Sequence, residues 1–208
     1  MKTPLYILGA GNVGAYLCYN IKDFPEFEVV GLFDDAPEKQ GKILYGFPVL
    51  DTITNCNSYL KDNSAVAICI HAPQVKKRIY QKIKGLSLMF PNFISPYAWV
   101  SPSVKLGKGL IIYPGVSINY ECVLGDFVNM NMNCAIGHNV TVNSYASLAP
   151  GVNLGGFTWV GEGVDFGIGA CTIQNMQIGA DSTVGGQAMI ITSFPENSKI
   201  IGVPAKAL

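Results

Sequence analysis

The chain has 208 residues, of which 49% are hydrophobic and only 13% are charged, and 23 are glycine. This length allows one large or two small domains, while abundant glycine with few charges indicates tight, repeated turns and surface buried in subunit contacts. Fourteen basic and fourteen acidic residues leave no net charge. That balance argues against a nucleic-acid-binding protein, and no run of charge points to a membrane surface.

The six cysteines stand singly, without a CxxC pair or the spacing of zinc ligands. Four lie in apolar sequence, as buried free thiols of a reducing compartment do: Cys18, Cys69, Cys122 and Cys134. The first ten residues are too short and too broken by glycine for a signal peptide or a membrane span. We therefore expect a cytoplasmic protein with no membrane-inserted segment and no metal site.

Up to about residue 92 the sequence alternates strand-like and helix-like segments. Strands are predicted at 5–8, 28–34, 65–70 and 86–90, and helices at 15–22 and 74–84. In the second helix Val75, Ile79 and Ile83 share one face, as in an amphipathic helix. This order predicts a small Rossmann-like α/β domain with a parallel sheet over residues 1–92.

After Phe93 the sequence changes to a strict repeat of six residues. Every sixth residue from Ile94 to Ile190 is apolar at sixteen of seventeen positions, and Thr172 is the exception. A period of six matches neither a helix nor a half-buried strand, but it fits a solenoid of short strands joined by turns. Residues 93–208 are thus predicted to form about five to six triangular coils of three hexads each. The alternative, an irregular glycine-rich β-sandwich, would require turn signals every 8–12 residues.

The hexads and the ending Gly202-Val203-Pro204-Ala205-Lys206 resemble the left-handed β-helix acyltransferases. A small glycine-loop domain directly before the β-helix narrows the resemblance to the sialic acid O-acetyltransferase and nucleotide-linked amino-sugar N-acetyltransferase group, the NeuD/PglD type. The left hand follows from the resemblance, because the general rule for parallel crossovers predicts the opposite hand. The resemblance covers essentially the whole chain. It implies acetyl-CoA as the acyl donor and a nucleotide-activated amino sugar as the acceptor, and a low-charge prism of this kind is expected to form a homotrimer.

The sequence Gly9-Ala10-Gly11-Asn12-Val13-Gly14 follows the first predicted strand and opens the first helix. Glycines let backbone N–H groups approach a phosphate at a helix start, and Asp34, twenty residues beyond Gly14, is placed to take ribose or base hydrogens. A dinucleotide site needs two mononucleotide halves, and the β-helix begins before a second half fits. One half suits a nucleoside diphosphate attached to a sugar. The alternative is a tight turn that binds no ligand.

The resemblance places further residues near the nucleotide sugar. Its implied contacts are Gly9, Gly11, Asn12, Asp34, Asp35 and His71. The chain departs from the family after the third strand, where members often carry a Gly-Asn or Gly-Asp pair and this chain has Cys69-Ile70-His71. A histidine at the end of a strand is more typical of a structural residue or a substrate contact than of a second catalytic group.

His138 lies just past a glycine corner in Ile136-Gly137-His138-Asn139, where a side chain points outward. Acetyl transfer needs a base to take a proton from the nucleophile, and imidazole suits that role at neutral pH. A lone surface histidine is usually inert, but the resemblance matches His138 to the catalytic histidine of the family. The family often has Glu or Asp next, whereas Asn139 can hydrogen-bond the ring without a negative charge. Glu121 and Asp126 are candidates for a carboxylate from elsewhere.

The resemblance also implies the binding residues of the β-helix. Asn131 is assigned to the acceptor sugar, and the groove for CoA between two subunits is assigned to Gly156, Ile168 and Gly186, with Lys206 near a CoA phosphate. Gly155-Gly156 is expected to offer a backbone N–H to the thioester oxygen. Cys134 has an inward hexad position, which argues against an acyl-cysteine route.

Three functions remain at this stage. The favoured one is N-acetylation of a nucleotide-linked amino sugar with His138 as general base. O-acetylation of a sialic acid or another sugar hydroxyl is the nearest alternative, but a hydroxyl needs stronger proton removal, so the uncharged Asn139 favours an amine. The third is a trimer that binds sugar nucleotides without catalysis.

Overall fold

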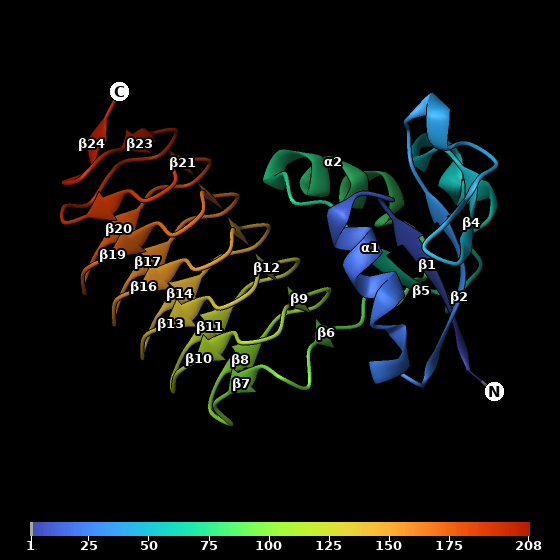
Figure 1. Cartoon of the computed structure of the whole chain (residues 1–208), viewed down its shortest axis with the longest axis horizontal. Helices are drawn as coiled ribbons and strands as arrows, with labels where there is room; N and C mark the ends of the chain where they lie inside the picture. The colour runs from blue at the N-terminus through green and yellow to red at the C-terminus, as the bar shows by residue number, and fades with distance from the viewer. Residues whose placement is uncertain (1) are drawn as a thin grey trace. The chain divides into compact units, whose positions relative to one another are not determined.

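The computed structural model describes residues 2–208, which form two compact units (Figure 1). The first contains the chain up to His71 together with Val75–Phe93, and the second contains Ala72–Gln74 and Ile94–Leu208. Among the described residues, no helix combines the length and apolar character needed to cross a membrane.

The N-terminal unit is built on a five-stranded sheet in the order β3-β4-β2-β1-β5. All neighbours are parallel except the antiparallel pair β3 and β4. The strands are β1 (Thr3–Leu8), β2 (Phe27–Phe33), β3 (Ile43–Leu44), β4 (Phe47–Asp51) and β5 (Ala65–Ile68). The helices are α1 (Asn12–Tyr19) and α2 (Pro73–Ile83), with short 3₁₀ turns at Ile21–Asp23, Pro37–Lys39 and Ile53–Ser58. The predicted parallel α/β sheet is confirmed.

Two details of this unit differ from the sequence prediction. The strand predicted at 86–90 is wrong: it is reduced to a single bridge between Met89 and Ala65, and both Leu86 and Met89 stay exposed, so little burial supports a longer strand. The hairpin of β3 and β4 was not predicted. Its two-residue turn, Tyr45-Gly46, has φ of 54° and 89°, which suits a tight hairpin although the sequence lacks the usual Asn-Gly or Asp-Gly signal.

The C-terminal unit is a parallel β-helix whose two-residue strands stack in register every 18 residues (Figure 1). One face consists of β7 (Trp99–Val100), β10 (Ser117–Ile118), β13 (Ala135–Ile136), β16 (Asn153–Leu154), β19 (Cys171–Thr172) and β22 (Met189–Ile190). We call this the β7–β22 face. The second consists of β8 (Lys105–Leu106), β11 (Val123–Leu124), β14 (Thr141–Val142), β17 (Trp159–Val160) and β20 (Gln177–Ile178). The third consists of β6 (Phe93–Ile94), β9 (Ile111–Ile112), β12 (Asn129–Met130), β15 (Ser147–Leu148), β18 (Asp165–Phe166), β21 (Thr183–Val184), β23 (Lys199–Ile201) and β24 (Lys206–Ala207).

The hexad positions point into the prism as predicted. From Ile112 to Ile190 each of them is buried, and most have no exposed surface. Ile94 and Val100 are half-buried and Leu106 is 41% exposed, because β6, β7 and β8 are the edge strands that no earlier coil covers. The fold class is therefore the predicted one, an α/β domain followed by a left-handed parallel β-helix.

The glycines that follow the hexad positions allow the coils to stack. A Cβ on Gly137 would lie 2.7 Å from the backbone nitrogen of Gly156 in the next coil, and one on Gly155 would lie 2.5 Å from the carbonyl carbon of Ile173. Both contacts are with backbone, which cannot rotate away. The glycine periodicity seen in the sequence is thus a consequence of close stacking at the corners.

Core and surface positions on one strand should differ sharply in their contribution to stability. Ile178 is fully buried, whereas its neighbour Gln177 in β20 is exposed. Ile178→Ala should lower the free energy of unfolding by about 2–5 kcal/mol through lost burial and the cavity left behind. Gln177→Ala, the matched control, should change it by about 0.5 kcal/mol or less. Chemical denaturation measures both values, and equal effects would contradict the assignment of the inward face.

Candidate active site

His138 lies in the corner between β13 and β14, with its ring held between aromatic side chains of adjacent coils. The ring stacks on Tyr120 with centroids 5.2 Å apart and planes 10° apart. On the other side Phe157 meets it edge-on, at 5.0 Å and 89°. Tyr120 precedes His138 by one coil of 18 residues, so the register of the prism brings the two rings together. The ring remains half-buried, neither in the core nor free on the surface.

Asn139 is the hydrogen-bond partner of the imidazole. Its side-chain Oδ1 lies 3.0 Å from His138 Nδ1, and its backbone N–H donates to the carbonyl oxygen of Tyr120 at 3.0 Å. A φ of 58° places Asn139 in the left-handed region that asparagine tolerates better than most residues. An amide oxygen only accepts, so Nδ1 carries the hydrogen and the neutral ring keeps its lone pair on Nε2.

The two candidate carboxylates do not take part in this contact. Among residues 2–208, neither Glu121 nor Asp126 forms a hydrogen bond with His138. The Asp126 carboxylate accepts a hydrogen bond from Lys108 N at 3.1 Å, in the corner after β11. The amide of Asn139 therefore stands where a carboxylate was sought.

Gly156 gives the imidazole its space. A Cβ at this position would lie 3.0 Å from both Cε1 and Nε2 of His138. Of the predicted CoA residues, Gly156 is thus the one that touches the predicted base. The expected N–H donor of the Gly155-Gly156 pair needs one correction: the Gly155 N–H already donates to Thr172 Oγ1 at 3.0 Å, which leaves Gly156 as the remaining candidate.

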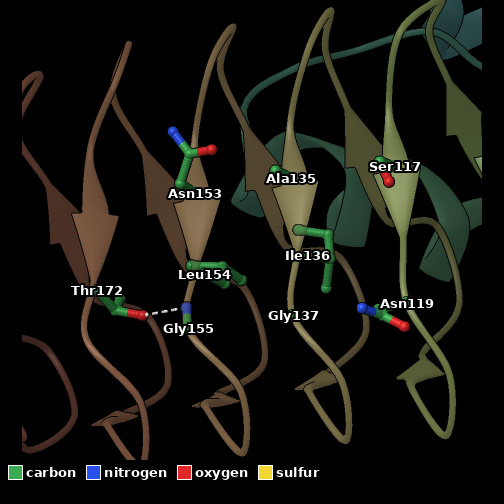
Figure 2. A pocket seen from close by; sticks show the side chains of 9 residues that line it. All are labelled: Ser117, Asn119, Ala135, Ile136, Gly137, Asn153, Leu154, Gly155 and Thr172. Carbon is green, nitrogen blue, oxygen red and sulfur yellow. Dashed lines mark hydrogen bonds between the residues drawn. The ribbon is translucent and has the colours of Figure 1, made fainter.

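A groove of about 390 Å³ runs over the β7–β22 face beside this corner (Figure 2). It crosses successive coils, from Ser117 and Asn119 to Asn153 and Thr172, and Gly137 in its wall directly precedes His138. Hydroxyl, amide and aliphatic groups share its lining. The groove therefore brings an elongated surface that mixes polar and apolar groups up to the imidazole corner.

The remaining predicted residues of the β-helix lie away from His138 within the protomer. Ile168 and Gly186 stack in the corner that leads into the β7–β22 face, on the side opposite His138, and Ile168 is 61% exposed. Asn131 lies in an earlier turn of that same corner, where its Oδ1 accepts a hydrogen bond from Met132 N at 2.7 Å. Lys206 is exposed in β24.

The glycine loop of the N-terminal unit contains one glycine that packing does not require. A Cβ on Gly9 would lie 2.6 Å from the carbonyl oxygen of Cys69, and one on Gly14 would overlap the carbonyl oxygen of Gly9. A Cβ on Gly11 would meet no heavy atom within 4 Å. Gly11 also provides no side-chain cap for α1, which begins at Asn12, and the first turn has no acidic residue. Open space thus lies where an anion would approach the start of the helix.

Asp34 closes the glycine loop from below. Its Oδ2 accepts hydrogen bonds from Ala10 N at 2.8 Å and Lys39 Nζ at 2.9 Å, and its Oδ1 accepts one from Ala36 N at 3.0 Å. Lys39 Nζ and the Tyr45 hydroxyl both donate to the carbonyl oxygen of Ala10 at 3.2 Å. The carboxylate is therefore a structural tie of the loop, and Lys39 adds a positive charge beside it.

These contacts decide the charge of Asp34. Burial alone would raise the pKa of the carboxyl, but the hydrogen bonds from Lys39, Ala36 and Ala10 outweigh burial and hold the pKa below its ordinary value. The group is consequently ionised at neutral pH and paired with Lys39.

The other predicted nucleotide contacts lie at the same edge of the sheet. Asp35 and His71 follow β2 and β5, whose carboxyl ends flank the glycine loop after β1. Asp35 accepts a hydrogen bond from Thr54 N at 3.3 Å and lines a pocket of about 280 Å³ with Arg78 and Lys82 of α2. This is the edge at which open α/β sheets bind ligands.

The cysteines are buried as the sequence predicted, apart from the half-buried Cys171. Burial raises the pKa of the Cys134 thiol to about 11, which leaves it protonated and poorly nucleophilic at neutral pH. An acyl-cysteine route through Cys134 is therefore excluded by position and by charge state. Within residues 2–208, no group of three or more His, Cys, Asp or Glu side chains is arranged to hold a metal ion.

Sequence reasoning identified His138 but missed the groups around it. Tyr120 and Gly156 stand 18 residues before and after His138, so one coil of spacing was the signal that could have found them. Lys39 and Tyr45 reach the glycine loop from a segment without periodicity, and no comparable sequence signal marks them.

Comparison with known proteins relates both units to sugar-nucleotide enzymes. Residues 4–83 match the family model of the PglD N-terminal domain. Perosamine N-acetyltransferase from Caulobacter crescentus, a variant solved with CoA and GDP-perosamine, is 26% identical with a TM-score of 0.90, over 100% of this chain and 98% of that one. The acetyltransferase domain of PglB from Neisseria gonorrhoeae FA1090 is 27% identical with a TM-score of 0.90 over 100% of both chains, and it has also been solved with acetyl coenzyme A.

Two further matches are more limited. WeeI from Acinetobacter baumannii AYE is 23% identical with a TM-score of 0.87, over 100% of both chains, which shows a shared fold. The redox-sensing transcriptional repressor Rex of Natranaerobius thermophilus is 32% identical over 91 residues, which is 41% of this chain. The chain spans less than half the length of that repressor, since the match covers 42% of it.

The contacts of Asp34 predict a pH-dependent contribution to stability. Because the folded-state pKa is lowered, this contribution is present above the unfolded-state pKa of about 4 and is lost as the pH falls through the folded-state value. Asp34→Asn should therefore be less stable than the wild type at pH 7, with a difference that shrinks below about pH 4. Thermal melts across this range measure it, with the exposed Asp62→Asn as control. A difference independent of pH would contradict the ionic role.

Proposed function

We propose that this chain, which belongs to the NeuD/PglD family of left-handed β-helix acetyltransferases, transfers the acetyl group of acetyl-CoA to the amino group of a nucleotide-linked sugar. The observation that carries the proposal is the imidazole of His138, which lies beside a groove with its Nδ1 bound by Asn139 and its Nε2 left as a base. Relatives that cover the whole chain and bind CoA, acetyl-CoA or GDP-perosamine support the two substrates.

His138 acts as the general base. The sugar amine attacks the thioester carbon, and the proton it loses moves to Nε2 of His138 as the carbon–nitrogen bond forms. The carbon–sulfur bond then breaks, CoA leaves as the thiolate, and the imidazolium returns the proton to sulfur. Asn139 holds the ring in the tautomer this sequence requires, because Oδ1 accepts the Nδ1 hydrogen at 3.0 Å.

The thioester oxygen becomes negative in the tetrahedral intermediate and needs a donor. We assign this donor to the backbone N–H of Gly156, which touches the imidazole and, among the described residues, makes no hydrogen bond. The acyl donor lies along the groove of the β7–β22 face. Ile168, Gly186 and Lys206 belong to the CoA site as contributions around a threefold axis, where the corner of one protomer completes the face of the next.

The N-terminal unit binds the nucleotide part of the acceptor. The open space at Gly11 and the uncapped start of α1 suit a diphosphate, and Lys39 neutralises Asp34 beside it. Asp35 and His71, at the same sheet edge, are positioned for the ribose or base, and Asn131 for the sugar. The enzyme works in the cytoplasm as a homotrimer.

An amine rather than a hydroxyl is the favoured nucleophile. Attack by a neutral amine releases a proton that is already acidic in the transition state, whereas a hydroxyl depends on a stronger base. An amide partner such as Asn139 does not stabilise the imidazolium as a carboxylate would, so the site is suited to the less demanding reaction.

Removal of the imidazole should abolish most of the activity without loss of the fold. His138→Ala should lower kcat by about 10²- to 10⁴-fold, the usual contribution of a general base. CoA binding by calorimetry and the melting temperature should stay close to wild type, because the ring is only half-buried. Thiol release from acetyl-CoA, measured over a panel of amino-sugar nucleotides, hydroxy sugars and free sugars, reports the activity.

The same panel separates the alternatives. Turnover with amino-sugar nucleotides alone supports N-acetylation, and turnover with hydroxy sugars instead would establish O-acetylation. Unchanged kcat in His138→Ala would contradict the mechanism, while no turnover with any acceptor would leave a binding protein.

Asn139→Asp should move the acid limb of the kcat/KM profile to higher pH. A carboxylate in contact with Nδ1 favours the imidazolium, so the ring loses its proton, and gains activity as a base, only at higher pH. Asn175 occupies the same corner two coils later, also with a left-handed φ, of 61°, and Asn175→Asp is the matched control. Equal shifts in the two variants would show a general charge effect and contradict the contact between Asn139 and His138.

A further inference from the structure

Thr172 is the polar exception among the inward hexad positions, and it forms a hydroxyl pair inside the prism. It is 7% exposed, and Thr158, which is 1% exposed, lies with its Oγ1 at 3.1 Å from Thr172 Oγ1. Thr158 Oγ1 also lies 3.4 Å from the carbonyl oxygen of Ile173, to which it donates. Burying hydroxyls in an apolar core is costly unless they are hydrogen-bonded, and here they are.

The hydroxyl of Thr172 replaces a backbone acceptor. In three other coils the residue after the strand donates its N–H, at 2.9–3.0 Å, to the carbonyl of the hexad residue one coil later: Asn119 to Ile136, Gly137 to Leu154, and Ile173 to Ile190. By this pattern Gly155 N would donate to the carbonyl oxygen of Thr172. It donates instead to Thr172 Oγ1 at 3.0 Å (Figure 2). Accordingly, the pairing of β16 with β19 contains only Asn153 and Cys171.

This exchange leaves a backbone acceptor at the groove. Within residues 2–208, no donor binds the carbonyl oxygen of Thr172. Thr172 lines the groove of the β7–β22 face together with Gly155. Buried or groove-lining carbonyls almost always find a donor, from protein, water or ligand. The one interruption of the ladder after a β7–β22 strand thus occurs next to Gly156, the residue against the imidazole.

We propose that Thr172 is a binding residue for the acyl donor: its hydroxyl holds the Gly155 N–H and thereby frees its own carbonyl to accept an amide N–H of the pantetheine arm. This inference rests on the proposed function, in which the groove holds acetyl-CoA. The pantetheine arm carries two secondary amides, each with an N–H that must find an acceptor when the arm leaves water. An apolar side chain at 172 would fill the core equally well, but Gly155 would then pair with the carbonyl as in the other coils.

Thr172→Val tests the proposal, because it removes the hydroxyl while keeping the shape. The Kd for coenzyme A from calorimetry and the KM for acetyl-CoA should rise about five- to tenfold, as expected for one lost hydrogen bond. The kcat at saturating acetyl-CoA should change less, and the melting temperature should be unchanged or higher. A crystal structure of the variant should show Gly155 N paired with the carbonyl oxygen of residue 172.

Two further variants distinguish this role from general packing. Thr172→Ser keeps the hydroxyl and should restore the affinity for coenzyme A close to wild type. Thr158→Val removes the partner hydroxyl but leaves the bond between Gly155 and Thr172, so its Kd should also stay close to wild type. Unchanged Kd in Thr172→Val, or equal losses in Thr172→Val and Thr158→Val, would overturn the proposal while the effect of His138→Ala still tests the proposed function by itself. Failure of the wild type to bind coenzyme A would overturn both.

Discussion

The close stacking of 18-residue coils is the constraint on which the rest of the structure depends. Backbone N–H groups of one coil bind carbonyls of the next, and corner glycines such as Gly137 keep that spacing because any side chain there would strike the following coil. Residues one coil apart therefore become neighbours. Tyr120, His138 and Gly156 are distant in sequence, yet they form one corner, with the imidazole placed between an aromatic ring and a glycine that leaves it space.

The chemistry of this corner depends on a neutral hydrogen bond. Asn139 fixes the orientation and tautomer of His138 through Oδ1, but it brings no charge to stabilise the imidazolium. The base is thus oriented as in a carboxylate-supported site and is electrostatically weaker. Selectivity for an amine and a neutral partner for the ring are consequently two aspects of the same physical arrangement. The groove beside it supplies the remaining need, an extended surface with both polar and aliphatic groups for a long acyl carrier.

Much of this could be predicted from the sequence because the information is periodic. The hexads determined which residues from Ile112 to Ile190 are buried, and the outward position of His138 followed from the same register. Non-periodic contacts were different. The tie between Lys39 and Asp34 joins an irregular loop to a strand end, and the apolar run at 86–90 carried no signal that it would pair only through Met89. Thr172 was visible as an exception, but its bond to Gly155 depends on a choice between two acceptors that spacing does not encode.

The most direct test of the account is a crystal structure of the chain with CoA and an amino-sugar nucleotide bound. The account predicts the CoA sulfur and the sugar amine within about 4 Å of Nε2 of His138, with the amine nitrogen within hydrogen-bonding reach of that atom. It also predicts that the ring keeps its contact with Asn139 Oδ1. A complex in which the amine or the sulfur lies at another corner of the prism, or in which Nε2 is covered by protein, would contradict the central claim that His138 is the base.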